Sequence, residues 1–593
     1  MNFWVRFNFG FAPVDLDQFR HIDTRPEAGV VQVLGGASQV ALVVPNDSGP
    51  LRPEPAQCVS LSGKLWLVGR IRLDAREELC SNLIEPGVDF ARESDASICL
   101  HAYAHWGDRC VERLKGDFCF VVWDERTQHL FCARDQMGVR PFFFAITGNS
   151  LFLSDSIDYI TAQKNVSSKL DNYWIGDFLA SGTCIDADRT VYEQIKRLPP
   201  GHCLSASENG WSSRRYWNLD VEYPIYYKDP RQYIDHFDEV LGHAIRDRLP
   251  PGRVGICMSG GLDSSTLAAC TVKVTGDAAK VVAHTHYFEH LIPDEEAKFG
   301  VLVAGKLGIS QTLRSLDDFC YDPHWYTREI NTSEPCDTIF QATPQRTMDA
   351  EMAELAQVWF LGEGPDNALL FEWRPYLSWL FQQGAWNRLR DAMVQYVVSK
   401  EAREWLTTLQ TYTTGPCVKG AAKTGLPEWL NDSFARETDL IGRADESKRG
   451  RRHSWHPRAF ANLTSSIWPS FLEQYDSTPL IWRHPYLDLR VLTFMLSVPP
   501  IPWARRKRLI RESMRGILPD SVLARDKTPL AEYPLAILLR KYGLPPLSSN
   551  SIVRYVDPTK LPCTFPAEPM THPLINVYVL DHWLNHRANA APH

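Results

Sequence analysis

The sequence predicts an α/β protein with a β-rich, layered N-terminal part and a C-terminal part built on a doubly wound parallel sheet. Short apolar runs separated by turn residues fill roughly the first 215 residues, as in proteins made of antiparallel strands. After about residue 230, strand patterns alternate with helix patterns, which is typical of a parallel sheet covered by helices. With 593 residues, the chain is long enough for two or three large domains.

Composition and charge exclude several classes of protein. With 44% hydrophobic and 23% charged residues, the chain is neither fibrous nor disordered. Its 63 Lys and Arg against 71 Asp and Glu give a net charge of −8, so no nucleic-acid partner is expected. The sequence has no apolar run long enough to span a membrane and no secretory signal pattern. We therefore expect a cytoplasmic protein without a membrane span, whose 14 cysteines are free thiols.

The N-terminal part is predicted over residues 1–217. Its apolar runs are short and are typical of buried strands. The clearest runs are Leu65–Val68, Phe118–Trp123 and Pro141–Phe144. A turn at Leu198–His202 and the segment Arg215–Trp217 close this part, and residues 218–230 are predicted to be a linker.

The C-terminal part, residues 231–593, begins with a helix and continues with alternating strands and helices. Apolar residues recur at helical spacing from Tyr233 to Ile245, and Pro250–Gly252 ends that helix. The units that follow are a strand over 254–258, a helix from Thr266, a strand over 280–285, a helix over 294–307 and a strand over 358–361. In such sheets a ligand binds outside the carboxyl ends of the strands. The rest of the chain is mostly helical in pattern.

The loop that joins the first of these strands to its helix, residues 259–265, is suited to bind phosphate. Gly260 and Gly261 let backbone amides approach an anion, and the following helix points its positive end toward it. The hydroxyl donors are Ser259, Ser264 and Ser265. The loop lacks the Gly-Lys-Ser/Thr of a Walker A motif, so it indicates a pyrophosphate site rather than cleavage at a γ-phosphate. Taken alone, it could instead be a Gly/Ser-rich turn.

A second loop, Gly362–Asn367, follows the third strand and adds a carboxylate at the same edge of the sheet. Asp263 from the first loop and Asp366 from the second could together hold Mg²⁺ against polyphosphate oxygens. The pair of loops is more specific than either one alone.

These loops and several further motifs resemble the asparagine synthetase superfamily, whose synthetase domain has the ATP-pyrophosphatase (PP-loop) fold. The resemblance covers nearly the whole chain. Leu114–Asp124 and Ala133–Pro141 resemble the family's class II glutamine amidotransferase domain, which is of the Ntn hydrolase type. In the C-terminal half, the matching segments are Arg483–Arg490, Lys507–Arg511, Leu518–Pro519 and Arg525–Thr528.

The N-terminal end departs from the glutamine-hydrolysing members of that family. Those members expose a cysteine after removal of the initiator, because its thiolate and the α-amine act together as nucleophile and base. Here position 2 is Asn2, and no Cys, Ser or Thr precedes Thr24. The family's arginine-rich glutamine-binding segment is not recognisable between Glu27 and Leu51. We expect no glutaminase activity and a domain that remains as a scaffold.

Loss of glutaminase indicates members that use an amine already present on the substrate. Two such groups resemble the chain: β-lactam synthetases and lasso-peptide macrolactam synthetases, or lasso cyclases. β-Lactam synthetases usually carry Tyr where this chain has Glu363, which favours lasso cyclases, as do Phe371–Leu377 and Pro499–Trp503. The reaction implied is adenylation of an Asp or Glu side chain of a precursor peptide, then ring closure by the peptide's N-terminal amine.

The resemblance implies roles for individual residues and partners. Lys527 matches the lysine that contacts the α-phosphate and the intermediate, Glu363 would accept the amine proton, and Asp263 and Asp366 would hold Mg²⁺. The residues assigned to ATP are Ser259, Gly260, Gly261, Asp263, Ser264, Ser265, Gly362 and Lys507. Asn367 replaces an acidic residue usual in asparagine synthetases. A leader peptidase and a leader-binding protein of the same pathway are the expected partners.

Other functions stay open at this point: an ammonia-dependent asparagine synthetase, a small-molecule amide synthetase and an inactive scaffold. Glu363 could instead cap a turn, and Lys527 could be a solvated surface charge. Asp294–Glu296 is expected to be a charge cluster at a helix N-terminus, with a nucleotide role as the alternative. His286 and His290 could share a helical turn and bind zinc, but packing is favoured because the order is not His-Glu-x-x-His.

Two basic runs, Lys448–Arg452 and Arg505–Arg508, are also interpreted in two ways. The first interpretation is a solvated face, and the second is a patch for pyrophosphate or an acidic peptide.

Overall fold

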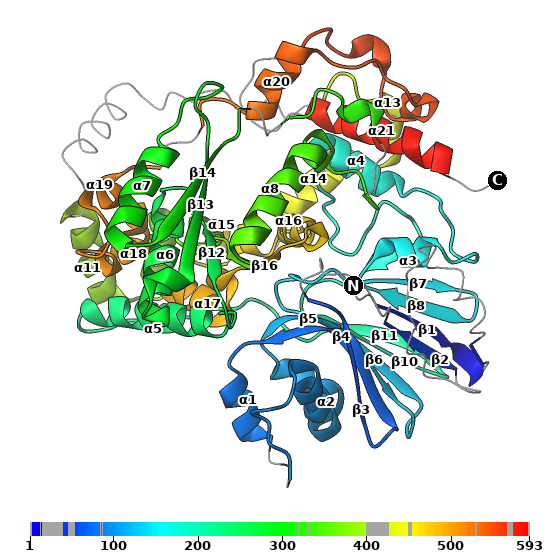
Figure 1. Cartoon of the computed structure of the whole chain (residues 1–593), viewed down its shortest axis with the longest axis horizontal. Helices are drawn as coiled ribbons and strands as arrows, with labels where there is room; N and C mark the ends of the chain where they lie inside the picture. Colours follow the sequence, from blue (N-terminus) through cyan, green and yellow to red (C-terminus); the bar gives the residue numbers. More distant parts are fainter. Residues whose placement is uncertain are drawn as a thin grey trace.

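The computed structural model describes residues 3–11, 13–14, 39–44, 54–83, 85, 87–317, 321–328, 332–398, 426–448, 453–527, 530–565 and 573–590. Within these residues the chain forms three sheets with helices around them (Figure 1). The layered β-rich N-terminal part and the doubly wound C-terminal sheet are both confirmed.

Two antiparallel sheets stack in the N-terminal part. The first has the order β2-β1-β8-β7-β9, and the second the order β11-β10-β6-β5-β4-β3. The strands of the first sheet are β1 (Trp4–Asn8), β2 (Val40–Val43), β7 (Phe143–Thr147), β8 (Ser150–Ser154) and β9 (Ile195–Arg197). Those of the second are β3 (Gln57–Leu61), β4 (Leu65–Leu73), β5 (Gly116–Asp124), β6 (His129–Arg134), β10 (His202–Ser207) and β11 (Gly210–Arg215).

Apolar side chains alternate along these strands and fill the space on both faces of the second sheet. On β5, Val121 faces the first sheet and contributes to the core shared with Phe7 and Leu153. Its neighbours Phe120 and Val122 point the other way, into a core covered by helices. Those helices are α1 (Arg76–Asn82), α2 (Asp95–Trp106) and η3 (Gly107–Glu112). The predicted run from Pro141 becomes a strand only at Phe143.

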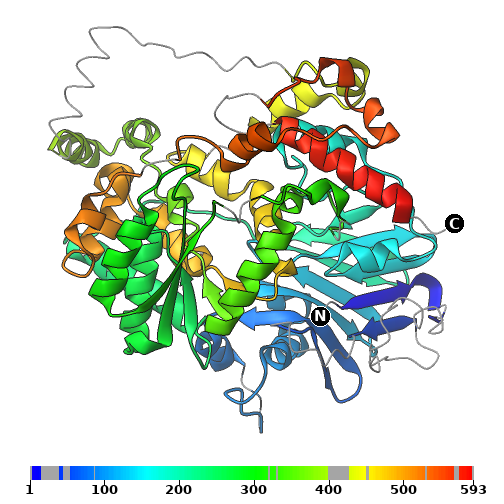
Figure 2. The same cartoon turned by 45° about the horizontal axis from the view of Figure 1, so that its top comes forward.

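The outer face of the first sheet contributes to an apolar core that includes helices from distant parts of the chain. Phe152 of that sheet, Trp174 near the start of α4 and Val579 near the C-terminus share one apolar core. Figure 2 shows the red C-terminal helix beside the cyan helices. The helices are α3 (Ile157–Thr161), α4 (Asn172–Ser181), α13 (Asp432–Glu437), α20 (Pro534–Tyr542) and α21 (Pro573–Ala590). The domain limits at 217 and 231 stay a prediction.

The C-terminal sheet is parallel throughout, with the order β14-β13-β12-β15-β16. Its strands are β12 (Val254–Cys257), β13 (Val281–Tyr287), β14 (Ser310–Ser315), β15 (Val358–Phe360) and β16 (Ile481–Arg483). Along β13, Ala283 packs into the core on one face, whereas Val282 packs with Met352 of α8 on the other. Helices therefore cover both faces, as in a doubly wound fold.

The helices on the first face are α5 (Arg231–Arg246), α6 (Leu262–Thr275), α7 (Glu296–Leu307), α17 (Leu489–Ser497) and α18 (Arg508–Ser513), and the second face carries α8 (Ala342–Leu355). The other helices are α9 (Pro365–Ala368), α10 (Trp373–Gln382), α11 (Trp386–Val398), α14 (Leu440–Lys448), α15 (Pro457–Leu463), α16 (Ile467–Glu473) and α19 (Asp520–Ala524). Short turns of helix are η1 (Phe9–Phe11), η4 (Ala278–Lys280), η5 (Trp325–Thr327), η6 (Asp337–Gln341), η7 (Gln474–Ser477), η8 (Pro485–Leu487), η9 (Pro500–Ala504), η10 (Arg505–Lys507), η11 (Asn550–Arg554) and η12 (Pro558–Lys560).

His286 and His290 do not share a helical turn. His286 lies in strand β13 and packs on His284 at a ring-centroid distance of 4.8 Å, whereas His290 lies in the loop that follows. The helical-turn alternative is therefore wrong, and the packing interpretation of His286 is right. The strand continues to Tyr287 because its partner β14 pairs with it that far.

No helix among the described residues is long and apolar enough to cross a membrane. The cysteines of the described ranges are free. Of the first basic run, only the backbone of Lys448 is described, and residues 449–452 lie outside the described ranges.

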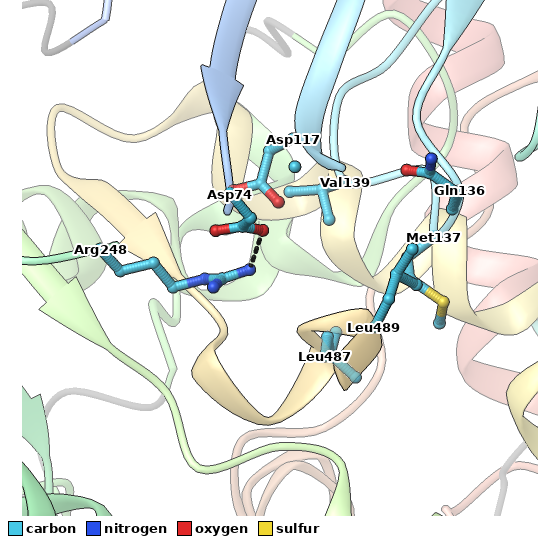
Figure 3. Close-up of a pocket in the computed structure, with 9 residues that line it drawn as sticks. Asp74, Asp117, Gln136, Met137, Val139, Arg248, Leu487 and Leu489 are labelled. Carbon is cyan, nitrogen blue, oxygen red and sulfur yellow. Dashed lines mark hydrogen bonds and ion pairs between the residues drawn. The ribbon is translucent and has the colours of Figure 1, made fainter. Parts of the chain in front are cut away.

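The two parts of the molecule meet through buried pairs of arginines and carboxylates. Figure 3 shows one of these pairs, in which Arg248 donates to Asp74 at 2.8 Å. The pair borders a cavity of about 10 Å³ that residues of both parts line, among them Asp117 and Leu487. This volume is about that of one water molecule, so the interface is closely packed there.

Candidate active site

The first loop approaches helix α7 so closely that a side chain at Gly260 would not fit. Gly260 has φ +65°, and a Cβ atom there would lie 2.8 Å from the carbonyl oxygen of Glu296. The loop is held from within, because Ser259 N–H donates to the Ser264 hydroxyl at 3.0 Å. Ser265 is buried, and its hydroxyl has no partner among the described residues. These features suit an anion at the N-terminus of α6.

The second loop lies directly beside the first. A Cβ atom at Gly362 would lie 3.2 Å from the backbone nitrogen of Ser264. Gly364 has φ +133°, and helix α9, which carries Asp366, begins at the next residue. The two loops predicted to share one edge of the sheet are therefore brought together.

Two lysines join the carboxylates of these loops. Lys507 forms ion pairs with Asp263 and, at 2.5 Å, with Asp366. Lys527 reaches the other oxygen of Asp366 at 2.6 Å. The Lys527 side chain is 73% exposed, so both interpretations of it have a basis: it is a surface charge that also contacts the site.

Burial and charge act differently on the three carboxylates. Burial raises the pKa of Asp263, and Lys507 only partly opposes this. Burial also disfavours ionisation of Asp366, but Lys507 and Lys527 outweigh it, so the pKa of Asp366 is lowered. Burial, and then the negative charges of Asp366 and Asp263, raise the pKa of Glu363. Glu363 is therefore the carboxylate of the second loop best suited to take up a proton.

The carboxylates fit a divalent cation. The Oδ1 atom of Asp263 is buried and has no hydrogen-bond partner among the residues described, and Asp366 presents a second carboxylate nearby. Such oxygen ligands are those that Mg²⁺ prefers. Asn367 does not extend this set, since its side-chain oxygen accepts a hydrogen bond from Asn462 at 3.1 Å.

The segment that carries Lys527 is fixed by residues that the sequence interpretation placed elsewhere. Glu296 forms an ion pair with Arg525 at 3.0 Å, and Asp294 accepts a hydrogen bond from the Glu296 backbone N–H at 2.9 Å. Arg511 donates to the carbonyl oxygen of Arg525 at 2.9 Å. The acidic cluster at 294–296 thus opens helix α7, as expected, and also holds the Lys527 segment.

Two tyrosines at the site were not predicted. The Tyr486 hydroxyl donates to the backbone carbonyl of Asp263 at 3.0 Å. The ring of Tyr475 packs on Trp482 and His484, close to the second loop. Tyr486 lies inside a motif that the sequence showed, so it could have been found there. Tyr475 lies outside the recognised motifs, and only its tertiary contacts single it out.

Comparison with known proteins places the molecule in a family. A glutamine amidotransferase domain model matches residues 54–217, and an asparagine synthase model matches residues 236–560, which is more than half of the chain. The chain belongs to the asparagine synthase family. This family member is therefore an ATP-dependent amide-forming ligase, with an N-terminal class II glutamine amidotransferase-like domain.

The asparagine synthase-family ligase has relatives over most of its length. It is 24% identical to "Asparagine synthetase [glutamine-hydrolyzing] 3" of Bacillus subtilis, over 80% of this chain and 77% of that protein. It is also 24% identical to the amidase chry2 of Gibberella zeae, over 74% of this chain and 72% of that protein. Among solved structures, glutamine phosphoribosylpyrophosphate amidotransferase from B. subtilis aligns at 14% identity and a TM-score of 0.24, over 53% of this chain and 65% of that one.

Proposed function

We propose that this ligase closes a macrolactam ring within a precursor peptide, as lasso cyclases do. It would join the N-terminal amine of the peptide to the side-chain carboxylate of an Asp or Glu in the same peptide. The observation that carries the proposal is Glu363, a carboxylate with a raised pKa on the loop that touches the phosphate-binding loop. A general base at this position can accept a proton from an amine that is part of the substrate.

In the first step, the substrate carboxylate attacks the α-phosphorus of ATP, and pyrophosphate leaves. The backbone amides and hydroxyls of the first loop, with Lys507, stabilise the charge on the leaving group. Bound Mg²⁺, held by Asp263 and Asp366, would neutralise further charge on the polyphosphate. Lys507 contacts both carboxylates, so its ammonium group lies where it can pair with the phosphate oxygens of the leaving pyrophosphate.

In the second step, the amine attacks the acyl carbon of the acyl-adenylate, and AMP leaves. Glu363 accepts the proton that the amine loses, and Lys527 stabilises the oxyanion that develops on the acyl oxygen. The product is an isopeptide bond, and the peptide has lost one water overall.

This reaction needs no ammonia from glutamine, so we also propose that the protein has no glutaminase activity. The expected site of the missing nucleophile, Asn2, lies outside the described residues. The adjoining Phe3 N–H donates to Asp155 at 2.8 Å, and Asp155 pairs with Arg70 at 3.4 Å. In this proposal a leader peptidase and a leader-binding protein prepare the peptide.

The test compares two substrate pairs with purified protein, ATP and Mg²⁺. One is a leader-free core peptide encoded beside the gene, with its peptidase and leader-binding protein, and the other is aspartate with ammonia. We expect AMP together with a peptide lighter by one water. Asparagine without a change in the peptide would instead make the protein an ammonia-dependent asparagine synthetase, and no AMP with either pair would indicate a scaffold.

A further inference from the structure

A short segment begins at the last residue of α16 and leads to β16, between the N-terminal part and the active site. It carries two acidic residues, Glu473 and Asp476, with Tyr475 between them. The acidic side chains contact arginines of the N-terminal part, whereas the tyrosine ring contacts residues near the active site.

Both acidic residues are held by arginines of the N-terminal part. Glu473 accepts hydrogen bonds from Arg134 at 2.8 Å and from Arg197 at 3.0 Å. Asp476 pairs with Arg70 and, at 3.3 Å, with Arg140. The side chains in these pairs are largely buried, so each pair is poorly screened by water. The segment is thus clamped on both sides of Tyr475.

Tyr475 lies against the strand ends that lead to Glu363. Its ring centroid is 5.2 Å from that of Trp482 and 5.8 Å from that of His484. Between those two residues, the carbonyl oxygen of Arg483 accepts a hydrogen bond from Leu361 N–H at 3.1 Å. Leu361 lies two residues before Glu363, so this hydrogen bond and the β15–β16 pairing link the strand beside Tyr475 to the second loop.

We propose that the N-terminal part acts as a brace that fixes Tyr475 behind the Glu363 loop and so sets the geometry of amide-bond formation. The inference rests on the proposed two-step reaction, and it makes Tyr475 a positioning residue for the second step. It gives the amidotransferase-like part a role that does not depend on glutamine.

The state of the Tyr475 hydroxyl agrees with this role. It has no hydrogen-bond partner in the described ranges, so it is available to a group in the site. Burial, and then the charge of Glu363, raise its pKa, so it remains protonated and able to donate.

The experiment compares two variants at the same interface. Asp476→Asn removes the charge that Arg70 and Arg140 hold. Asp177→Asn removes a buried carboxylate that pairs with Arg443 at 2.6 Å, and neither of these two residues lies in the segment. Hydrogen–deuterium exchange on the full-length protein reports the mobility of residues 473–484 and 361–363 without any substrate. Pyrophosphate exchange into ATP then reports the first step, and amide product reports the second, with whichever substrate pair the wild type accepts.

For Asp476→Asn we expect faster exchange in both segments, amide formation lowered by about tenfold or more, and pyrophosphate exchange changed by less than about threefold. Asp177→Asn should leave exchange in those segments and the ratio of the two rates unchanged. Unchanged exchange in Asp476→Asn, or an equal loss in both steps, would overturn the brace.

Tyr475→Phe keeps the ring and decides the matter if Asp476→Asn does not fold. We expect it to lower amide formation, with pyrophosphate exchange unchanged. Wild-type rates for both steps would contradict a positioning role. If the wild type adenylates neither substrate, the proposed reaction fails, while the exchange measurement on Asp476→Asn still decides whether the brace exists.

Discussion

At the scale of single residues, the carboxylates of the site differ in pKa because their surroundings differ. Asp366 faces two lysines and keeps a lowered pKa, which suits a group that stays charged. Glu363 is half-buried, and this burial and the charges of Asp366 and Asp263 raise its pKa, which suits a group that exchanges protons. Glu363 and Asp366, on the same loop, are therefore suited to different chemical roles.

Glu363→Gln tests the proton acceptor. We expect amide formation to fall by about 10²–10⁴-fold, because a general base contributes that much, with pyrophosphate exchange within a few-fold of the wild type. Because the pKa of Glu363 is raised, the wild-type rate should rise with pH through a limb above the usual glutamate value of about 4.3. The variant should lack this limb; the same limb in the variant would assign it to another group.

Lys527→Met tests charge stabilisation at the acyl group. We expect the overall rate to fall by about 10²–10³-fold, as when one stabilising donor is removed from an oxyanion site. Lys298→Met is the matched control, since Lys298 is also exposed and pairs with Glu295 rather than with a carboxylate of the two loops. If the two variants behave alike, Lys527 is a surface charge and nothing more.

At the scale of elements, the site depends on how closely the first loop approaches helix α7. Gly260 combines a left-handed backbone with a close neighbour on α7, whereas Gly276, at the end of α6, has the same φ of +65° and open space around it. A comparison of substitutions at these two positions therefore distinguishes the cost of backbone strain from the cost of steric contact.

Gly260→Ala and Gly276→Ala should therefore differ. Both variants bear the cost of a left-handed alanine, about 1–2 kcal/mol of folding free energy. Only Gly260→Ala must also displace the α7 backbone, so we expect a larger fall in Tm and weaker ATP binding for it, measured by calorimetry. Equal losses would show that the close approach is not needed.

At the scale of the whole molecule, the two parts are held together by buried ion pairs. Burial opposes the ionisation of Glu473, but Arg197 and Arg134 outweigh it and lower its pKa. Because the pKa of Glu473 is lower in the folded protein than in the unfolded chain, its ionised form stabilises the fold. This contribution is fully present above the pKa of Glu in the unfolded chain, about 4.3, and is lost as the pH falls through the lower pKa of the folded protein.

Glu473→Gln should therefore destabilise the protein mainly near neutral pH. Removing one partner of a buried pair costs about 3–5 kcal/mol, so we expect a clear loss in Tm at about pH 7 that shrinks at about pH 3. Glu112→Gln, which removes an exposed pair with Arg109, should change Tm little at either pH. A loss for Glu473→Gln that does not depend on pH would indicate packing rather than charge.

The positions of the first loop, residues 259–265, and of the Asp366 loop could be predicted from the sequence because their signals are local. Each is a few residues between a buried strand and a helix, and the pattern of a parallel sheet places both at one edge. The two sheets of the N-terminal part were predictable as β structure for a similar reason, since alternating apolar residues and turns mark strands wherever they pair. His286 was ambiguous because a spacing of four does not by itself separate helix from strand.

The sequence by itself therefore determined the type of fold, the family resemblance and the two loops that we propose bind a nucleotide. Only the tertiary structure decided that α21 packs beside α4, that β16 extends the sheet, and that Tyr475 stands between two clamped carboxylates. The physical reason is distance along the chain. Arg70 and Asp476 are 406 residues apart, so they can form a buried pair only when the whole molecule has folded.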